Sequence, residues 1–267
     1  MQTELSSVAR VSFRPRIAMQ LQQQHADYAA IRRTVAEAED LGTDVIFNWD
    51  HFYPLYGDPD GKHFECWTML GAWAEQTTRP QLGALVTCNS YRNPELLADM
   101  ARTVDHLSDG RLILGIGSGW FQKDYDEYGY DFGTAGRRLD DLAESLPRIE
   151  SRWAKLNPAP TRKIPVLIGG GGEKKTLRMV ARHADIWHSF SDLETFRRKQ
   201  EVLAAHCADA GRDPGEIERS VGAPNGDPAE VGPKLVEAGA GMFTIGIGGP
   251  DYDLTKLRRW LAWRDAL

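Results

Sequence analysis

The sequence predicts an α/β protein with a (β/α)8 barrel, and two observations carry this prediction. Apolar strand-like runs and helix-like segments alternate eight times along the 267 residues. The polar, aromatic and glycine-rich residues follow the predicted strands, whereas ordinary turns such as "LGTD" and "TTRP" precede them. A doubly wound sheet is the alternative, but such a sheet more often stops at about five or six strands.

Short apolar runs predict the strands, and apolar residues at helical spacing predict the helices. The predicted strands are residues 16–21, 44–48, 82–87, 111–116, 166–168, 185–188, 217–221 and 242–247. The predicted helices are residues 28–41, 64–76, 94–107, 138–156, 176–183, 193–210, 229–238 and 254–266. Because no linker or low-complexity segment interrupts the series, we expect one domain over residues 1–267.

Composition and charge fit an ordinary globular protein and argue against two classes of partner. Hydrophobic residues make up 42% and charged residues 26% of the chain. The net charge of −6 argues against nucleic acid or an anionic membrane as the main partner. No apolar run approaches the ~20 residues that span a bilayer. Three widely spaced cysteines and a polar N-terminus without a signal core predict a cytoplasmic protein, and no metal-ligand spacing occurs.

Four consecutive glycines, Gly169 to Gly172, stand between a predicted strand and a predicted helix. Glycine permits close backbone approach, and the N-terminus of a helix favours an anion, so this turn predicts a phosphate site. The spacing matches neither a Walker A loop nor a dinucleotide fingerprint. A tight turn without a ligand is the alternative.

The pair Asp50-His51 follows the second predicted strand and is the pair in the sequence best suited to acid/base chemistry. Histidine titrates near neutrality and acts as a general acid or base, and Asp50 is a candidate to fix its tautomer or to accept a hydrogen bond from a cofactor. In the alternative, Asp50 caps a turn and His51 is packed. The acidic stretch from Asp124 to Tyr128 lacks the pattern of a calcium loop, so we expect a solvated loop.

Three further features lie after predicted strands. The glycines of "GIGSGW" would let a flat ring lie against the backbone, or would fit a tight barrel interior. Cys88 is more simply interpreted as a packed thiol than as a nucleophile, because no base is placed near it by sequence. Trp49, Trp120 and Trp187 either wall an apolar pocket or pack in the core.

Together these motifs resemble the luciferase-like monooxygenase superfamily, and more narrowly its branch of oxidoreductases that use coenzyme F420. The resemblance covers about residues 16–249. It is carried by "DVIFNWDHF", "TCNSYRNPELLADMARTVDHLSDGRLILGIGSGW", "YDEYGYDFGTAGRRLDDL" and "IPVLIGGGGEKKTLRMVARHADIW".

The resemblance implies a bacterial-luciferase-like barrel with the cofactor ring at the strand ends. Asp50 would lie near the deazaflavin, His51 would be the catalytic acid or base, and a cis peptide would join Leu85 to Val86. The glycine turn would hold the cofactor's phosphate. The full implied cofactor set is Asp50, Leu85, Val86, Thr87, Cys88, Ser118, Gly119, Gly170, Gly171, Gly172 and Glu173. The substrate pocket would contain Trp49, Trp120 and His188.

The implied activity is hydride transfer between the C5 atom of F420 and a small organic substrate. Trp120 stands where F420-dependent sugar-phosphate dehydrogenases have a second acid/base Glu, which argues against their reaction. The alternatives are an FMN-dependent monooxygenase and an F420-binding protein without turnover. Cations near Lys174 and Lys175 would favour F420, whose tail is an anionic oligoglutamate. The resemblance also implies a homodimer.

Overall fold

The structure, a computed structural model, describes residues 14–190 and 192–267. The strands are β1 (Arg16–Gln22), β2 (Val45–Asn48), β3 (Gln81–Ala84), β4 (Thr87–Cys88), β5 (Leu112–Gly117), β6 (Val166–Gly169), β7 (Ile186–Ser189), β8 (Glu218–Gly222) and β9 (Met242–Gly248). The α-helices are α1 (Tyr28–Asp40), α2 (Cys66–Gln76), α3 (Pro94–Leu107), α4 (Gln122–Tyr128), α5 (Ala135–Trp153), α6 (Thr176–His183), α7 (Leu193–Ala210), α8 (Pro228–Glu237) and α9 (Thr255–Asp265). Within these ranges, no helix is long and apolar enough to cross a membrane.

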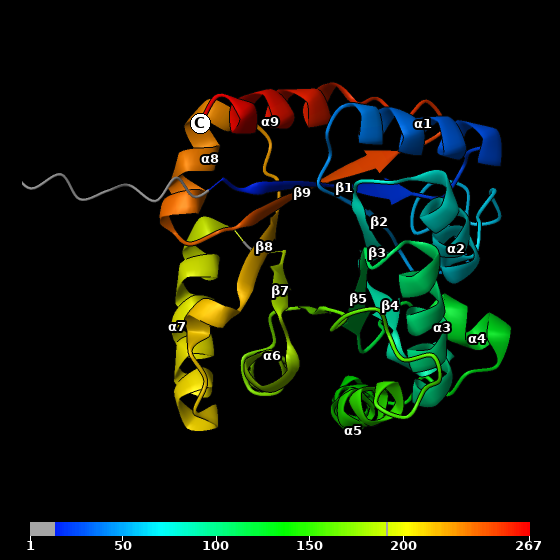
Figure 1. Cartoon of the computed structure of the whole chain (residues 1–267), viewed down its shortest axis with the longest axis vertical. Helices are drawn as coiled ribbons and strands as arrows, with labels where there is room; N and C mark the ends of the chain where they lie inside the picture. The colour runs from blue at the N-terminus through cyan, green and yellow to red at the C-terminus, as the bar shows by residue number, and fades with distance from the viewer. Residues whose placement is uncertain (1–13, 191) are drawn as a thin grey trace, which may run out of the picture.

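The strands close into a parallel barrel, as the sequence predicts. They pair in the order β3-β2-β1-β9-β8-β7-β6-β5-β4, and the pairing of β3 with β5 closes the ring. In Figure 1 the larger helices surround these strands, with α9 and α1 along one edge and α5 to α7 at the opposite end. Because the strands are parallel, all their carboxyl ends open on the same side, and the loops that follow them build one surface.

The predicted third strand is divided into β3 and β4, which share one place in the barrel. The division falls at Leu85 and Val86, and the peptide bond between them is cis. The implied cis bond is therefore confirmed. The side chain of Gln20 on β1 donates a hydrogen bond to the carbonyl oxygen of Leu85 at 2.7 Å, so β1 holds this bend from inside the barrel.

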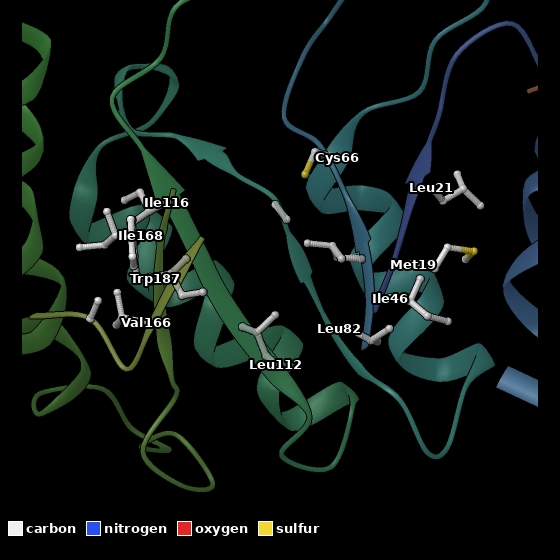
Figure 2. Close-up of a cluster of buried hydrophobic side chains, with 14 of the residues drawn as sticks. Met19, Leu21, Ile46, Cys66, Leu82, Leu112, Ile116, Val166, Ile168 and Trp187 are labelled. Carbon is white, nitrogen blue, oxygen red and sulfur yellow. The ribbon is translucent and has the colours of Figure 1, made fainter. Parts of the chain in front are cut away.

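Alternating residues along each strand fill two separate cores. The barrel interior contains Ala18, Val45, Phe47, Leu85, Ile113, Leu167, Ile186 and Met242. A larger core lies between strands and helices. Figure 2 shows part of it, with Met19 and Ile46 at the right of the view and Ile168 and Trp187 at the left. Trp187 stacks on Phe196 of α7, so the interpretation of this tryptophan as a core residue is confirmed.

A helix that the sequence does not predict, α4, follows β5. Asp124 and Tyr125 in α4 are fully buried, so the prediction of a solvated loop was wrong for these two residues. The helix ends at Gly129, whose φ of 71° is the left-handed conformation typical of a helix C-terminus. Burial is possible because Asp124 finds its hydrogen-bond donors in the loop after β2, more than 70 positions away.

Candidate active site

A cavity of about 370 Å³ lies at the carboxyl ends of the strands. It is lined by Gln20, Trp49, Asp50, His51, Leu55, Leu85, Val86, Cys88, Tyr91, Gly117, Ser118, Gly119, Trp120, Gly169, Gly170 and Phe190. Loops from β2, β4, β5, β6 and β7 therefore meet here, as expected for a barrel enzyme. A more polar cavity of about 300 Å³ beside α5 contains none of the residues that the sequence analysis selects.

Most of the predicted site residues meet in this cavity. Those that line it are Trp49, Asp50, His51, Leu85, Val86, Cys88, Ser118, Gly119, Trp120 and Gly170. Five predicted residues are not part of its lining, namely Thr87, Gly171, Gly172, Glu173 and His188. Thr87 is buried in β4, whereas Gly171 to Glu173 continue the turn that Gly170 begins. The roles of all these residues remain predictions.

His51 is held by a carboxylate on α4. Its Nδ1 lies 2.7 Å from Oδ2 of Asp124, whose side chain is fully buried. The same oxygen accepts a hydrogen bond from the hydroxyl of Tyr91 at 3.0 Å. The other oxygen, Oδ1, accepts from the backbone N–H groups of Phe52 and Tyr53 at 3.1 and 3.2 Å. Asp124 thus fixes both the His51 ring and the loop that carries it.

This contact occupies one of the two ring nitrogens of His51. Because Nδ1 of His51 meets an acceptor, it carries a proton, and Nε2 is the nitrogen that remains for a ligand. A buried carboxylate on Nδ1 is the arrangement by which hydrolytic triads set the tautomer of their histidine. The suggestion that Asp50 fixes the tautomer of His51 was wrong, since neighbouring residues of an extended chain point in opposite directions.

Asp50 is instead paired with Arg92. The guanidinium of Arg92 reaches both carboxylate oxygens, at 2.5 and 2.9 Å, and the backbone N–H of Cys88 donates to Oδ2 at 2.9 Å. Arg92 also contacts Glu65 at 3.0 Å. Despite burial, these carboxylates raise the pKa of Arg92. The ion pair ties the end of β2 to the loop after β4.

Aromatic rings surround His51. The rings of Trp49, Trp120 and Phe121 lie edge-to-face with its imidazole, with centroids 6.0, 5.7 and 5.5 Å away. Nε1 of Trp49 lies 3.2 Å from Nε2 of His63. Burial lowers the pKa of His63 to about 4, so at neutral pH this histidine is uncharged and accepts the hydrogen bond of Trp49.

Cys88 is a protonated thiol at neutral pH. Burial raises its pKa to about 11, and its Sγ lies 3.2 Å from the hydroxyl of Tyr125. Because the thiolate is the nucleophilic form, this cysteine is not a nucleophile in the structure described. The interpretation of Cys88 as a packed thiol is confirmed.

Two glycines of the cavity lining lie against Val86. A Cβ on Gly117 would lie 2.7 Å, and one on Gly169 2.9 Å, from a methyl group of Val86. Neither position has room for a side chain beside Val86. The expectation that small residues near strand ends let a ring approach the backbone fits this arrangement.

The glycine turn offers backbone donors to solvent. Gly170 has a φ of +119°, and its N–H donates to the carbonyl of His188. Among the described residues, no acceptor meets the N–H groups of Gly171, Gly172 or Glu173. Three adjacent free N–H groups before a helix N-terminus suit an anion such as phosphate.

Three of the cationic side chains around this turn have partners within the protein. Lys199 of α7 donates to the carbonyl of Gly171 at 2.7 Å, and Arg198 forms an ion pair with Glu173. Lys175 lies 2.6 Å from Asp140 of α5, which places its ammonium toward that helix. Lys174 is exposed.

His188 lies below the cavity rather than in its lining. Its Nδ1 is 2.8 Å from Oγ of Ser220 on β8, and the ring of Phe190 packs edge-to-face against it at 4.4 Å. Complete burial lowers the pKa of His188 to about 3, so the imidazole is neutral at physiological pH. Phe190, two residues further along the chain, is part of the cavity lining.

Two side chains that hold predicted site residues in place escaped the sequence analysis. Asp124 was placed in a solvated loop, and Arg92 was not singled out at all. For Asp124 one signal existed, because Tyr125 and Tyr128 share its segment and favour packing over solvation. No local pattern pairs Arg92 with Asp50, since their contact joins two different loops.

The sequence matches the model of the luciferase-like monooxygenase family over residues 10–225. It is 30% identical over 184 residues to an uncharacterised protein of Mycobacterium tuberculosis, covering 60% of this chain and 64% of that protein. It is 32% identical over 154 residues to an F420-dependent glucose-6-phosphate dehydrogenase of Amycolatopsis mediterranei, covering 51% of this chain and 45% of that protein. The chain thus aligns with less than two thirds of these relatives.

Solved structures share the fold. An F420-dependent secondary alcohol dehydrogenase in complex with an F420-acetone adduct superposes with a TM-score of 0.80, covering 95% of this chain and 98% of that chain at 16% identity. A riboflavin lyase with modified FMN superposes with a TM-score of 0.66, covering 84% and 66% at 14% identity. The family match spans most of the chain and agrees with the closed barrel, and we conclude that this protein belongs to the luciferase-like monooxygenase family.

Proposed function

We propose that the protein is a coenzyme F420-dependent oxidoreductase that transfers a hydride between the deazaflavin and a small organic substrate. The observation that carries this proposal is the position of His51. Its Nδ1 is fixed by a buried carboxylate, and its ring lines a cavity whose lining includes Val86 and glycines. Such a site offers one proton donor or acceptor next to a surface that a flat ring can cover.

The residues present fit the cofactor. Val86 and the neighbouring glycines Gly117 and Gly169 form a part of the lining without long side chains, which suits a tricyclic ring. The free N–H groups of Gly171, Gly172 and Glu173 suit its phosphate. A bound deazaflavin would supply or accept hydride at C5.

The protein's own contribution is orientation and proton transfer. Asp124 holds Nδ1 of His51, so Nε2 is the nitrogen that gives a proton to, or takes one from, a substrate oxygen. The buried pair of Asp50 and Arg92 keeps the loops after β2 and β4 together around this position. The apolar surroundings of His51 exclude water from the reacting atoms.

The first test is a fluorescence titration of the purified protein with F420 and, separately, with FMN at fixed salt. We expect saturable F420 binding at micromolar concentration, with FMN at least about tenfold weaker, since the site would contact groups that FMN lacks. Preference for FMN would overturn the proposal and favour a flavin monooxygenase. FMN is included in the titration because a riboflavin lyase with modified FMN shares this fold.

Two variants locate the site in the same titration. In Gly170→Ala an alanine must adopt a φ of +119°, and we expect F420 to bind about tenfold more weakly because the turn is distorted. Gly129→Ala is the matched control, since this glycine also has a positive φ but lies at the end of α4 with open space around it. Equal losses of F420 affinity in both variants would mean that the substitutions destabilise the protein in general and do not act through the glycine turn.

His51→Ala separates binding from chemistry. We expect F420 affinity to stay within about twofold while turnover falls about 10²-fold or more, the usual contribution of a general acid or base. Equal loss of affinity and turnover would contradict the acid/base role. Tight F420 binding without turnover of any substrate in the native protein would instead favour a cofactor-binding protein.

A further inference from the structure

The outer end of the cavity carries two large aromatic rings that face solvent. Trp120 follows β5 and is 63% exposed, and Phe190 follows β7 and is 69% exposed. Both line the cavity that contains His51. Exposed rings of this size at the mouth of a cavity are informative, because they mark surfaces that bind apolar groups.

The aromatic character continues inward to His51. Trp120 and Phe121 lie edge-to-face with the imidazole from one side, and Trp49 does so from another. A molecule that reaches Nε2 of His51 from solvent therefore passes between aromatic rings. Flat and apolar molecules gain from such contacts, both by burial and by ring stacking.

The same end offers no cation for an anionic molecule. Within residues 14–190 and 192–267, no Lys or Arg side chain lines the cavity. Two arginines contact lining residues, and both have partners. Arg92 forms ion pairs with Asp50 and Glu65. Arg138 donates hydrogen bonds to the carbonyl oxygens of Gly119 and Phe132. Asp50, the carboxylate among the described lining residues, is already paired with Arg92, so neither group is available to an anion.

We infer that the His51 end of the cavity binds a neutral, apolar or aromatic molecule with a carbonyl group, and discriminates against phosphorylated and carboxylated molecules. The carbonyl oxygen would meet Nε2 of His51, and the apolar part would lie against Trp120 and Phe190. An anion there would lose its hydration without gaining an ion pair. This inference rests on the proposed function and names its substrate class.

A matched pair of ligands tests the inference by binding alone. Acetophenone and benzoate have the same ring and similar size, but one is a neutral ketone and the other an anion at pH 7. We expect ligand-observed NMR to give a Kd for acetophenone at least about tenfold below that for benzoate, with and without F420, because only benzoate must be stripped of a charged group's hydration. Equal affinities, tighter benzoate binding or no binding of either ligand would overturn the inference.

Variants of the two exposed rings locate the binding. Trp120→Ala and Phe190→Ala should each weaken acetophenone about fivefold, the size expected for one lost ring contact. Leu96→Ala is the control, because Leu96 is a comparably exposed apolar side chain on α3, outside this cavity. An acetophenone Kd that is as low in Trp120→Ala as in Leu96→Ala would contradict binding of acetophenone against Trp120.

The outcomes separate the inference from the proposed function. Loss of F420 binding with a retained preference for acetophenone would remove the F420 proposal but leave the neutral ligand site intact. F420 binding together with a preference for benzoate would leave the cofactor assignment and overturn the substrate class. The F420 titration and the ligand pair are measured on the same protein sample.

Discussion

The two sides of the cavity differ in how they hold charge. On the side built by β2, β4 and β5, the buried carboxylates Asp50 and Asp124 are each hydrogen-bonded by partners from another loop. On the side built by β6, β7 and β8, the turn after β6 is glycine, and the buried polar residues His188 and Ser220 are neutral and bonded to each other. No buried ion pair is found on that second side among the described residues.

Under the proposed function, this difference assigns a separate task to each side. Ionised groups in a fixed network hold a proton carrier in one orientation, which is what His51 needs. A turn without side chains exposes backbone N–H groups instead, which is what a phosphate needs. The first side should therefore control turnover and the second side cofactor affinity. Three predictions challenge this division, in order of decreasing effect.

The largest effect should come from breaking the ion pair on the charged side. Arg92→Met leaves Asp50 buried without its cation, and we expect the free energy of unfolding to fall by about 3–5 kcal/mol, measured by urea denaturation. Arg148→Met is the control, because its ion pair with Glu95 is about half exposed, and its loss should change the free energy of unfolding far less. Similar losses in both variants would mean that Asp50 does not depend on Arg92.

The next effect should be on catalysis. In Asp124→Asn, the remaining oxygen can still accept from the N–H groups of Phe52 and Tyr53, but the amide NH₂ opposes the Nδ1 proton of His51. We expect the other tautomer and a turnover about 10²-fold lower, equivalent to about 2.7 kcal/mol, with F420 affinity within about twofold.

A pH profile distinguishes positioning of His51 by Asp124 from a general structural role. A positioning effect should change the pH dependence of turnover as well as its rate, because it acts on a proton-transfer step. An unchanged profile with a lower melting temperature would mean that Asp124 supports the loop only.

The smallest effect concerns pH on the neutral side. Burial holds the pKa of His188 at about 3, below its usual value of about 6.5, so the unfolded chain binds a proton between these values and the folded chain does not. Stability should therefore fall as pH drops below about 6.5. We expect the free energy of unfolding to be about 2 kcal/mol lower at pH 5 than at pH 8 from this residue alone.

His188→Gln isolates that contribution, because glutamine can keep a hydrogen bond to Ser220 without titrating. Denaturation curves at pH 5 and pH 8 should differ less in the variant than in the native protein. Identical differences in both proteins would show that His188 is not kept neutral by the fold.

The barrel could be predicted because its signals are local. Each strand–helix pair shows its own periodicity, so eight pairs suffice to indicate the fold without knowledge of any contact. The main error, α4, arose where the signal was shortest: seven residues with only two buried positions resemble a loop. The split of β3 from β4 at Leu85 and Val86 was implied by resemblance, not by periodicity.

The candidate site was predictable residue by residue but not as a set of contacts. The sequence alone determined that His51, the glycine turn and Trp120 follow predicted strands. In a parallel barrel, residues that directly follow a strand lie at the carboxyl-terminal end of the barrel. Only the tertiary structure decided that Asp124 holds His51, that Arg92 neutralises Asp50, and that Phe190 covers His188. These contacts join loops from different strands, and their geometry depends on side-chain packing that a one-dimensional pattern does not contain.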